Sequence, residues 1–125
     1  MPDYVRIQKG PELTIIEFLG PLTEKTFFAA FREGVTKNLL FIFSDVHNFY
    51  DLTPRTLEEL AKFSATFDHL RPNGRSASVV TGPMQQSIVN LYAAISHAVV
   101  ERKIEFRSFT NEEDALNWLN SKDGK

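Results

Sequence analysis

The sequence predicts an α/β fold: a single domain over residues 1–125, with a mixed, mostly parallel five-stranded sheet and four helices. Strand-like and helix-like segments alternate in the order β-β-α-β-α-β-α-β-α, which is typical of crossovers between parallel strands. The run Leu39–Phe43 is apolar without alternation, as in a strand covered on both faces. The length of 125 residues also suits one domain.

The chain is predicted to open with two strands joined by a tight turn. Residues 4–8 alternate, with Val5 and Ile7 set against polar neighbours. Residues 9–12 have turn composition, and residues 13–19 form the second strand. The short link predicts a β-hairpin, which adds an antiparallel strand to the sheet.

The first helix is predicted over about residues 23–36, with Thr23 as its N-cap. Adjacent residues on a helix point about 100° apart, so we expect that Phe27 and Phe28 do not both reach the sheet. The helical spacing predicts an apolar face of Phe27, Phe28, Phe31 and Val35.

The second helix is predicted to begin at Thr53-Pro54, with Thr53 as N-cap and Pro54 in the first turn. It is expected to end at the turn 71–74, before a strand of small residues over 76–81. Its apolar stripe is Leu57, Leu60, Phe63, Phe67 and Leu70.

The third helix follows Gly82-Pro83, and residues 103–109 alternate like a strand at or near a sheet edge. A capping box at 110–113 opens the last helix, before a polar tail at 121–125. The apolar faces of these two helices are Ile88, Leu91, Tyr92, Ile95 and Val99, and then Ala115, Trp118 and Leu119.

Composition excludes several kinds of function. There is no cysteine, and hence no disulfide, thiolate nucleophile or cysteine-based metal site. The 14 basic and 16 acidic residues argue against a nucleic-acid binder, and Arg71, Arg75, Arg102 and Lys103 are expected to be ordinary solvated charges. No apolar run approaches the roughly 20 residues of a membrane span, and no signal-peptide pattern is present. We therefore expect a cytoplasmic protein without stable membrane insertion.

Three segments carry a resemblance to a known family. They are Gly74–Val80, Phe106–Phe109, and Glu113–Leu119 with its Ala-Leu-Asn-Trp-Leu pattern. Together with the element order, they resemble the STAS domain of bacterial anti-sigma-factor antagonists, and more particularly the SpoIIAA-like family. The resemblance implies a SpoIIAA-like fold and a non-enzymatic regulatory module that contacts a protein partner.

The functional STAS motif is Asp-Ser-Ser-Gly-Leu before the second helix, and its second serine is phosphorylated by a partner kinase. The matching stretch here is Asp51-Leu52-Thr53-Pro54-Arg55. Asp51 is retained, whereas Leu52 and Pro54 depart from the motif. The resemblance implies that Thr53 is a possible phosphoacceptor, and its role as an N-cap is the alternative explanation.

Ligands of open α/β sheets bind outside the carboxyl ends of the parallel strands. The sequence places a polar and aromatic loop, Thr81 and Met84 at this edge. No nucleophile–base set, spaced metal ligands or glycine-rich phosphate loop is present, so no enzyme, metal or cofactor is expected. The candidate binding residues are Asp45, His47, Asn48, Phe49, Tyr50, Asp51, Thr53, Thr81 and Met84.

The 11 phenylalanines leave a second hypothesis open. Most fit the predicted core, but Phe27 or Phe28, together with Phe49 and Tyr50, could line a pocket or a homodimer face. The CRAL-TRIO lipid-transfer domain has a related architecture, so the alternative function is a carrier of a small apolar ligand or lipid.

Overall fold

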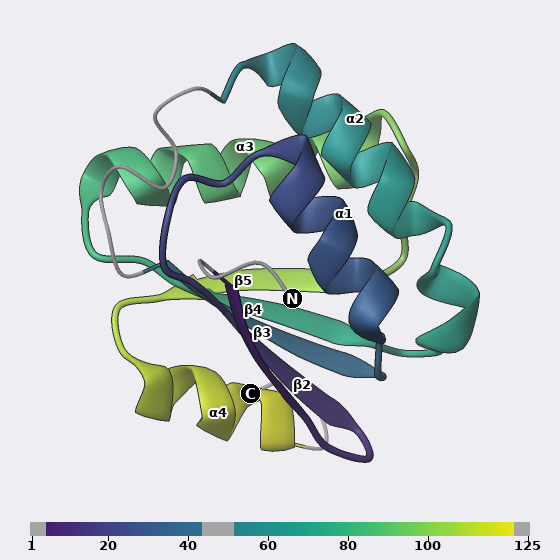
Figure 1. Ribbon diagram of the computed structural model, residues 1–125, viewed down its shortest axis with the longest axis vertical. Helices are drawn as coiled ribbons and strands as arrows, with labels where there is room; N and C mark the ends of the chain where they lie inside the picture. Colours follow the sequence, from purple (N-terminus) through teal and green to yellow (C-terminus); the bar gives the residue numbers. More distant parts are fainter. Residues whose placement is uncertain (1–4, 44–51, 122–125) are drawn as a thin grey trace.

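The five strands form one sheet in the order β1-β2-β3-β4-β5, so that neighbours in the chain are neighbours in the sheet (Figure 1). β1 runs antiparallel to β2, and the remaining pairs are parallel. The predicted α/β class, the hairpin and the edge position of the last strand are therefore confirmed. In the computed structural model, which describes residues 5–43 and 52–121, the strands are β1 (Val5–Lys9), β2 (Leu13–Phe18), β3 (Asn38–Phe43), β4 (Arg75–Val79) and β5 (Glu105–Phe109).

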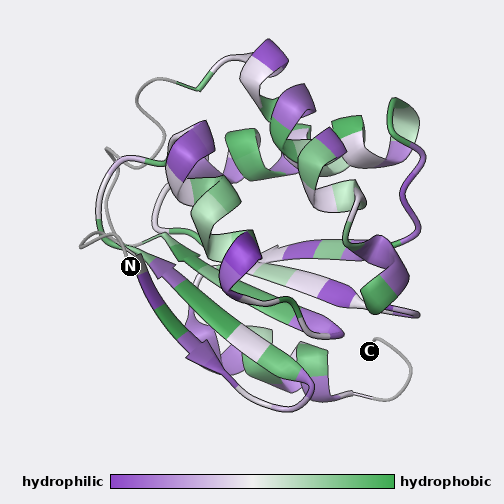
Figure 2. Ribbon diagram, turned by 45° about the vertical axis from the view of Figure 1, so that its right-hand side comes forward, coloured by the Kyte–Doolittle hydropathy of each residue, from purple (hydrophilic) through white to green (hydrophobic). Residues whose placement is uncertain are grey.

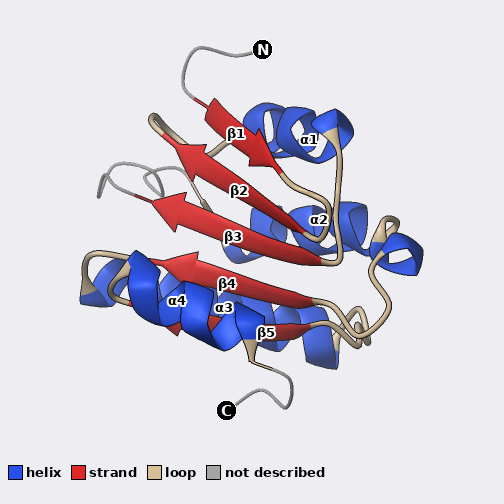
Figure 3. Cartoon of the chain, turned by 90° about the horizontal axis from the view of Figure 1, so that it is seen from below, coloured by secondary structure: helices blue, strands red, loops and turns tan. Residues whose placement is uncertain are grey.

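The helices α1, α2 and α3 cover one face of the sheet and α4 covers the other (Figure 1). The crossovers through α1, α2 and α3 all step in the same direction along the sheet, and right-handed crossovers then place their helices on the same face. α4 follows the last strand and packs on the opposite face, over β4 and β5 (Figure 3). The helices are α1 (Glu24–Glu33), α2 (Pro54–Ala65), α3 (Pro83–Ala98) and α4 (Glu112–Asn120).

The two faces of the sheet have separate cores because successive strand residues point to opposite sides. Phe41 of β3 packs with α1, whereas Leu40 packs with α4. The prediction that β3 is covered on both faces is thus confirmed. The helices change between hydrophilic and hydrophobic along their length, as amphipathic helices do (Figure 2).

Phe27 and Phe28 take different partners, as expected from their positions on α1. The Phe27 ring stacks on Phe31 at 4.7 Å and lies 6.3 Å from Phe41 of the sheet. The Phe28 ring instead lies 4.0 Å from Phe63 of α2. Both rings are therefore part of the packing between α1 and its neighbours.

Three predicted boundaries are wrong. α1 ends at Glu33 and not at about residue 36, because Gly34 follows as its C-cap and donates its amide to the Phe31 carbonyl at 3.2 Å. α2 ends at Ala65 and not at the turn 71–74; a short 3₁₀ turn (Asp68–Leu70) follows, and Leu70 is exposed. The hydroxyl of Thr66 donates to the Phe63 carbonyl (2.6 Å), a local bond of the kind that competes with helix propagation. At α4 the N-cap is Asn111 and not the first residue of the predicted box, because its Oδ1 accepts from the Asp114 amide at 2.8 Å.

Three of the four charges expected to be solvated are buried. Arg71, Arg75 and Arg102 are 1%, 9% and 7% exposed, and only Lys103 conforms to the prediction. Arg75 donates to the Trp118 carbonyl at 2.8 Å and thereby caps the end of α4. The long arginine side chains reach inward because backbone carbonyls and carboxylates at the chain turns accept their donors, a signal that a count of charges does not contain.

Candidate functional site

The carboxyl ends of β2, β3 and β4 lie at one edge of the sheet, where their arrowheads align (Figure 3). α2 and α3 begin at this carboxyl edge, because each follows a strand that ends there. Three of the nine candidate binding residues, Thr53, Thr81 and Met84, are brought to it. The other six lie outside the described residues: Asp45, His47, Asn48, Phe49, Tyr50 and Asp51.

Thr53 is the N-cap of α2, as predicted. Its Oγ1 accepts from the Thr56 amide at 3.2 Å and lies 3.0 Å from the Thr56 hydroxyl. Thr53, Pro54 and Arg55 are exposed, and the first turn of α2 contains no acidic residue. The hydroxyl is therefore both a helix cap and accessible at the surface.

Thr81 takes part in a closed set of hydrogen bonds at the start of α3. The buried Gln85 side chain accepts from the Thr81 amide at 2.6 Å and from its hydroxyl at 2.8 Å. Gln86 donates to Ser108 of β5 at 3.2 Å. This bond lies where the chain after β4 turns to one face of the sheet and the chain after β5 turns to the other. These bonds tie α3 to the sheet edge, so Thr81 is best explained as part of a helix start.

Met84 begins an apolar stripe on the outside of α3. Met84 and Leu91 of α3 and Val99, its C-cap residue, are 57%, 40% and 56% exposed. The predicted apolar face of α3 is thus only partly core, because Ile88 packs inward while Leu91 and Val99 face out. We call Met84, Leu91 and Val99 the α3 stripe.

The stripe lies in a region without charge. No Asp, Glu, Lys or Arg occurs between Ser76 and Val100, although charged residues are 24% of the chain. Elsewhere the surface follows the usual pattern, as α4 shows with Glu112, Glu113 and Asp114 in its first turn. The absence of charged residues over this stretch is visible in the sequence and indicates an exposed apolar surface. The helical spacing of the apolar residues, taken alone, predicts a core face.

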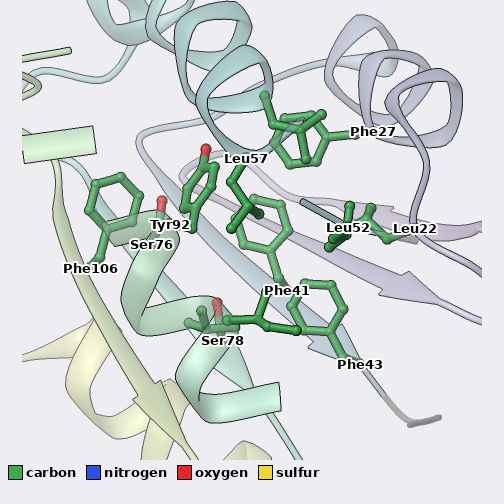
Figure 4. A pocket seen from close by; sticks show the side chains of 13 residues that line it. Leu22, Phe27, Phe41, Phe43, Leu52, Leu57, Ser76, Ser78, Tyr92 and Phe106 are labelled. Atoms are coloured by element: carbon green, nitrogen blue, oxygen red, sulfur yellow. The ribbon is translucent and has the colours of Figure 1, made fainter. Parts of the chain in front are cut away.

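A small apolar cavity lies beneath α2 and α3, with a volume of about 50 Å³ (Figure 4). Ser76 and Ser78 of β4 leave this space, because their short side chains lie where larger ones would meet the helices. The Tyr92 hydroxyl lies 2.7 Å from Ser64 Oγ and accepts from Arg102 at 3.0 Å. The apolar walls of the cavity include Leu22, Phe27, Phe41, Phe43, Leu57 and Ile88.

Within residues 5–43 and 52–121, no three His, Asp or Glu side chains are grouped closely enough to hold a metal ion. His97 lies on α3 with its Nε2 2.8 Å from the Ile104 carbonyl, while His69 is an exposed residue of the 3₁₀ turn. In the same described part of the chain, no helix has the length and hydropathy that crossing a membrane requires.

The fold and this edge define an α/β domain with a sequential mixed sheet, whose carboxyl edge continues into an uncharged helix. Comparison of the chain with protein-family models, curated proteins and solved structures gives no match. The SpoIIAA-like resemblance therefore rests on the three sequence segments and the element order alone, and it stays a prediction.

Proposed function

We propose that the protein is a non-enzymatic interaction module of the SpoIIAA-like type, which binds a cytoplasmic protein partner through the α3 stripe and the adjacent start of α2. The observation that carries the proposal is the exposed apolar stripe in an uncharged stretch. Protein interfaces are depleted of charge at their centres and contain apolar anchors. A partner with an apolar, uncharged contact surface fits best, because a charged one would lose hydration without gaining an ion pair.

The start of α2 belongs to the same region. Leu52 lines the cavity together with Ile88 of α3, so the two helix starts are neighbours at the carboxyl edge. A phosphate on Thr53 would lie at the positive end of α2, near Arg55 and away from any acidic first-turn residue. In this proposal, phosphorylation of Thr53 changes the affinity for the partner.

Site-specific photo-crosslinking in the native cell tests the docking surface. A photoreactive residue at Leu91 should yield a product between this chain and a different protein, and Met84→Glu should reduce its yield. The matched control is the same probe at Leu70, an exposed leucine (52%) of the 3₁₀ turn after α2, at the opposite end of the sheet from Met84. The same products from both positions, or a product containing only copies of this chain, would contradict the proposal.

The phosphorylation step has its own test. Thr53→Asp keeps a side chain that caps a helix well and adds a negative charge, whereas Thr53→Ser keeps the cap without the charge. The crosslinking yield at Leu91 should change with Asp and stay at the wild-type level with Ser. An unchanged yield with Asp would exclude a charge-operated switch at this residue.

The apolar cavity supports a second candidate function, a carrier of a small apolar ligand. Its volume of about 50 Å³ is well below the roughly 300 Å³ of sites for drug-sized ligands, so a lipid would enter only if α2 and α3 moved apart. Native mass spectrometry of the gently purified protein should then show an adduct, and Ser78→Leu, which fills the cavity, should remove it. A clean mass for the wild type would reject the carrier.

A further inference from the structure

A second hollow lies at the opposite end of the sheet, where β4 and β5 begin. This amino-end groove has a volume of about 550 Å³ and is formed by the 3₁₀ turn after α2, the turn before β4 and the segment between α3 and β5. Its size is within the range of small-molecule sites. Nothing in the proposed docking at α3 uses it.

Two buried guanidinium groups line the groove, and among the described residues only that of Arg102 has a carboxylate partner. Arg102 forms a two-pronged ion pair with Asp68, at 2.9 Å from Nε to Oδ2 and 2.8 Å from Nη2 to Oδ1. Its Nη1 donates to Ser64 at 2.6 Å and to Tyr92 at 3.0 Å. Burial opposes the charge of Arg102, but the bonds to Asp68 and Tyr92 outweigh burial and raise its pKa.

Arg71 is more deeply buried and lacks such compensation. Its Nε donates to the carbonyls of Thr36 and Lys37 at 3.1 Å, and its Nη2 donates to the Arg75 carbonyl and the Ser76 hydroxyl. Its Nη1 has no hydrogen-bond partner among the described residues. Burial, together with the nearby charge of Arg102, lowers the pKa of Arg71 to about 10, so the group remains a cation at neutral pH.

The groove therefore has an excess of positive charge. Its lining contains the cations of Arg71, Arg102 and Lys103, against the carboxylates of Asp68 and Glu101. Asp68 is already paired with Arg102, and Lys103 is exposed at the rim. An unpaired buried charge is costly, and an anion held nearby reduces that cost. Val100 and Ile104 add apolar wall beside these charges.

From this arrangement we propose that the amino-end groove binds a small organic oxyanion, with a carboxylate or phosphate group directed toward Arg71, Arg102 and Lys103. The apolar wall takes the organic part, and the cations hold the oxygen atoms. Arginine and lysine are the side chains that bind both kinds of oxyanion through charge-assisted hydrogen bonds. The proposal is independent of the partner at α3.

Proton–nitrogen NMR titration of the whole chain tests the site at constant ionic strength, with sodium chloride replaced in separate arms by phenyl phosphate and by benzoate. At least one probe should cause saturable shifts confined to amides around the groove, such as Asn73, Glu101 and Lys103. The arm with the lower dissociation constant identifies the oxyanion. Shifts that do not saturate, or that spread over all exposed cations, would overturn the proposal.

Matched lysine variants make the test specific, and they avoid substitutions of the buried arginines. Lys103→Gln should weaken binding about two- to fivefold, the amount expected for loss of one exposed charge. Lys62→Gln removes another exposed lysine, which is on α2 and outside the groove lining, and should leave the dissociation constant unchanged. Equal weakening by both variants would show a general charge effect and no site.

Discussion

The two ends of the β4 strand differ in the chemistry that surrounds them. At its amino end, Arg102 is buried in a network with Asp68, Ser64 and Tyr92, and the buried Arg71 donates to backbone carbonyls and to the Ser76 hydroxyl. At its carboxyl end, the chain enters a stretch without charge, in which exposed positions are held by Met84 and Leu91.

This difference separates binding by charge from binding by apolar contact within one small fold. The carboxyl edge is where ligands of open α/β sheets are expected, but here its polar groups Thr53 and Thr81 are engaged in helix starts. Arg71 Nη1, a buried nitrogen without a hydrogen-bond partner among the described residues, is at the other end. The substitutions below test how independent these two ends are.

The largest effect is expected from Asp68→Asn at the amino end. The change removes the carboxylate that forms the ion pair with Arg102 and leaves two buried guanidinium groups without a nearby negative charge. The free energy of unfolding should therefore fall by about 3–5 kcal/mol. Urea unfolding followed by the fluorescence of Trp118, the one tryptophan, measures it. Glu58→Gln, which breaks the exposed pair with Lys62, is the control and should have little effect. Comparable losses of unfolding free energy in the two variants would mean that the buried Arg102–Asp68 pair stabilises the fold no more than the exposed Glu58–Lys62 pair.

At the carboxyl edge, Gln85→Leu should cost about 1–3 kcal/mol. The change keeps the side chain buried but leaves the amide and hydroxyl of Thr81 without their acceptor. The matched variant Gln86→Leu loses only an exposed hydrogen bond to Ser108, which water can replace, and should cost clearly less in the same unfolding measurement. If Gln85→Leu proves neutral, the start of α3 does not depend on this network.

Loss of the helix cap at Thr53 should have a smaller effect. Thr53→Ala should lower the free energy of unfolding by about 1 kcal/mol, since the Thr56 amide loses its acceptor, while Thr53→Asp should remain close to the wild type. Thr23→Ala, at the cap of α1, provides a second cap for comparison. Equal stability of Thr53→Ala and wild type would argue that the hydroxyl is retained for another purpose.

The smallest effect on stability is expected on the α3 stripe. Leu91→Glu should change the free energy of unfolding by no more than about 0.5 kcal/mol, because Leu91 is 40% exposed and belongs to neither core cluster. The same variant should reduce the yield of partner crosslinked through a probe at Met84. Ile88→Glu, one turn away and packed on the core, should destabilise the fold clearly. A large loss of stability for Leu91→Glu would show that the stripe is structural.

Much of the fold could be predicted from local patterns. The apolar run of β3 predicted a strand covered on both faces, and Thr23 and Thr53 predicted the starts of α1 and α2. These signals are local, because a cap or an alternating strand depends on residues within a few positions. The predicted end of α2 was wrong. Phe67 and Leu70 continue the helical spacing of α2, but the chain leaves the helix before them and places Asp68 beside Arg102.

The sequence by itself determined the α/β class, the order of the elements and the absence of thiol chemistry, because residue spacing and composition are properties of the chain alone. Only the tertiary structure decided which charges are buried and which apolar residues are exposed. Arg71 and Arg102 were expected in solvent but are buried, and Leu91, on the predicted apolar face of the third helix, is 40% exposed. The physical reason is that burial depends on which segments fold over a side chain, and those segments are distant in the sequence.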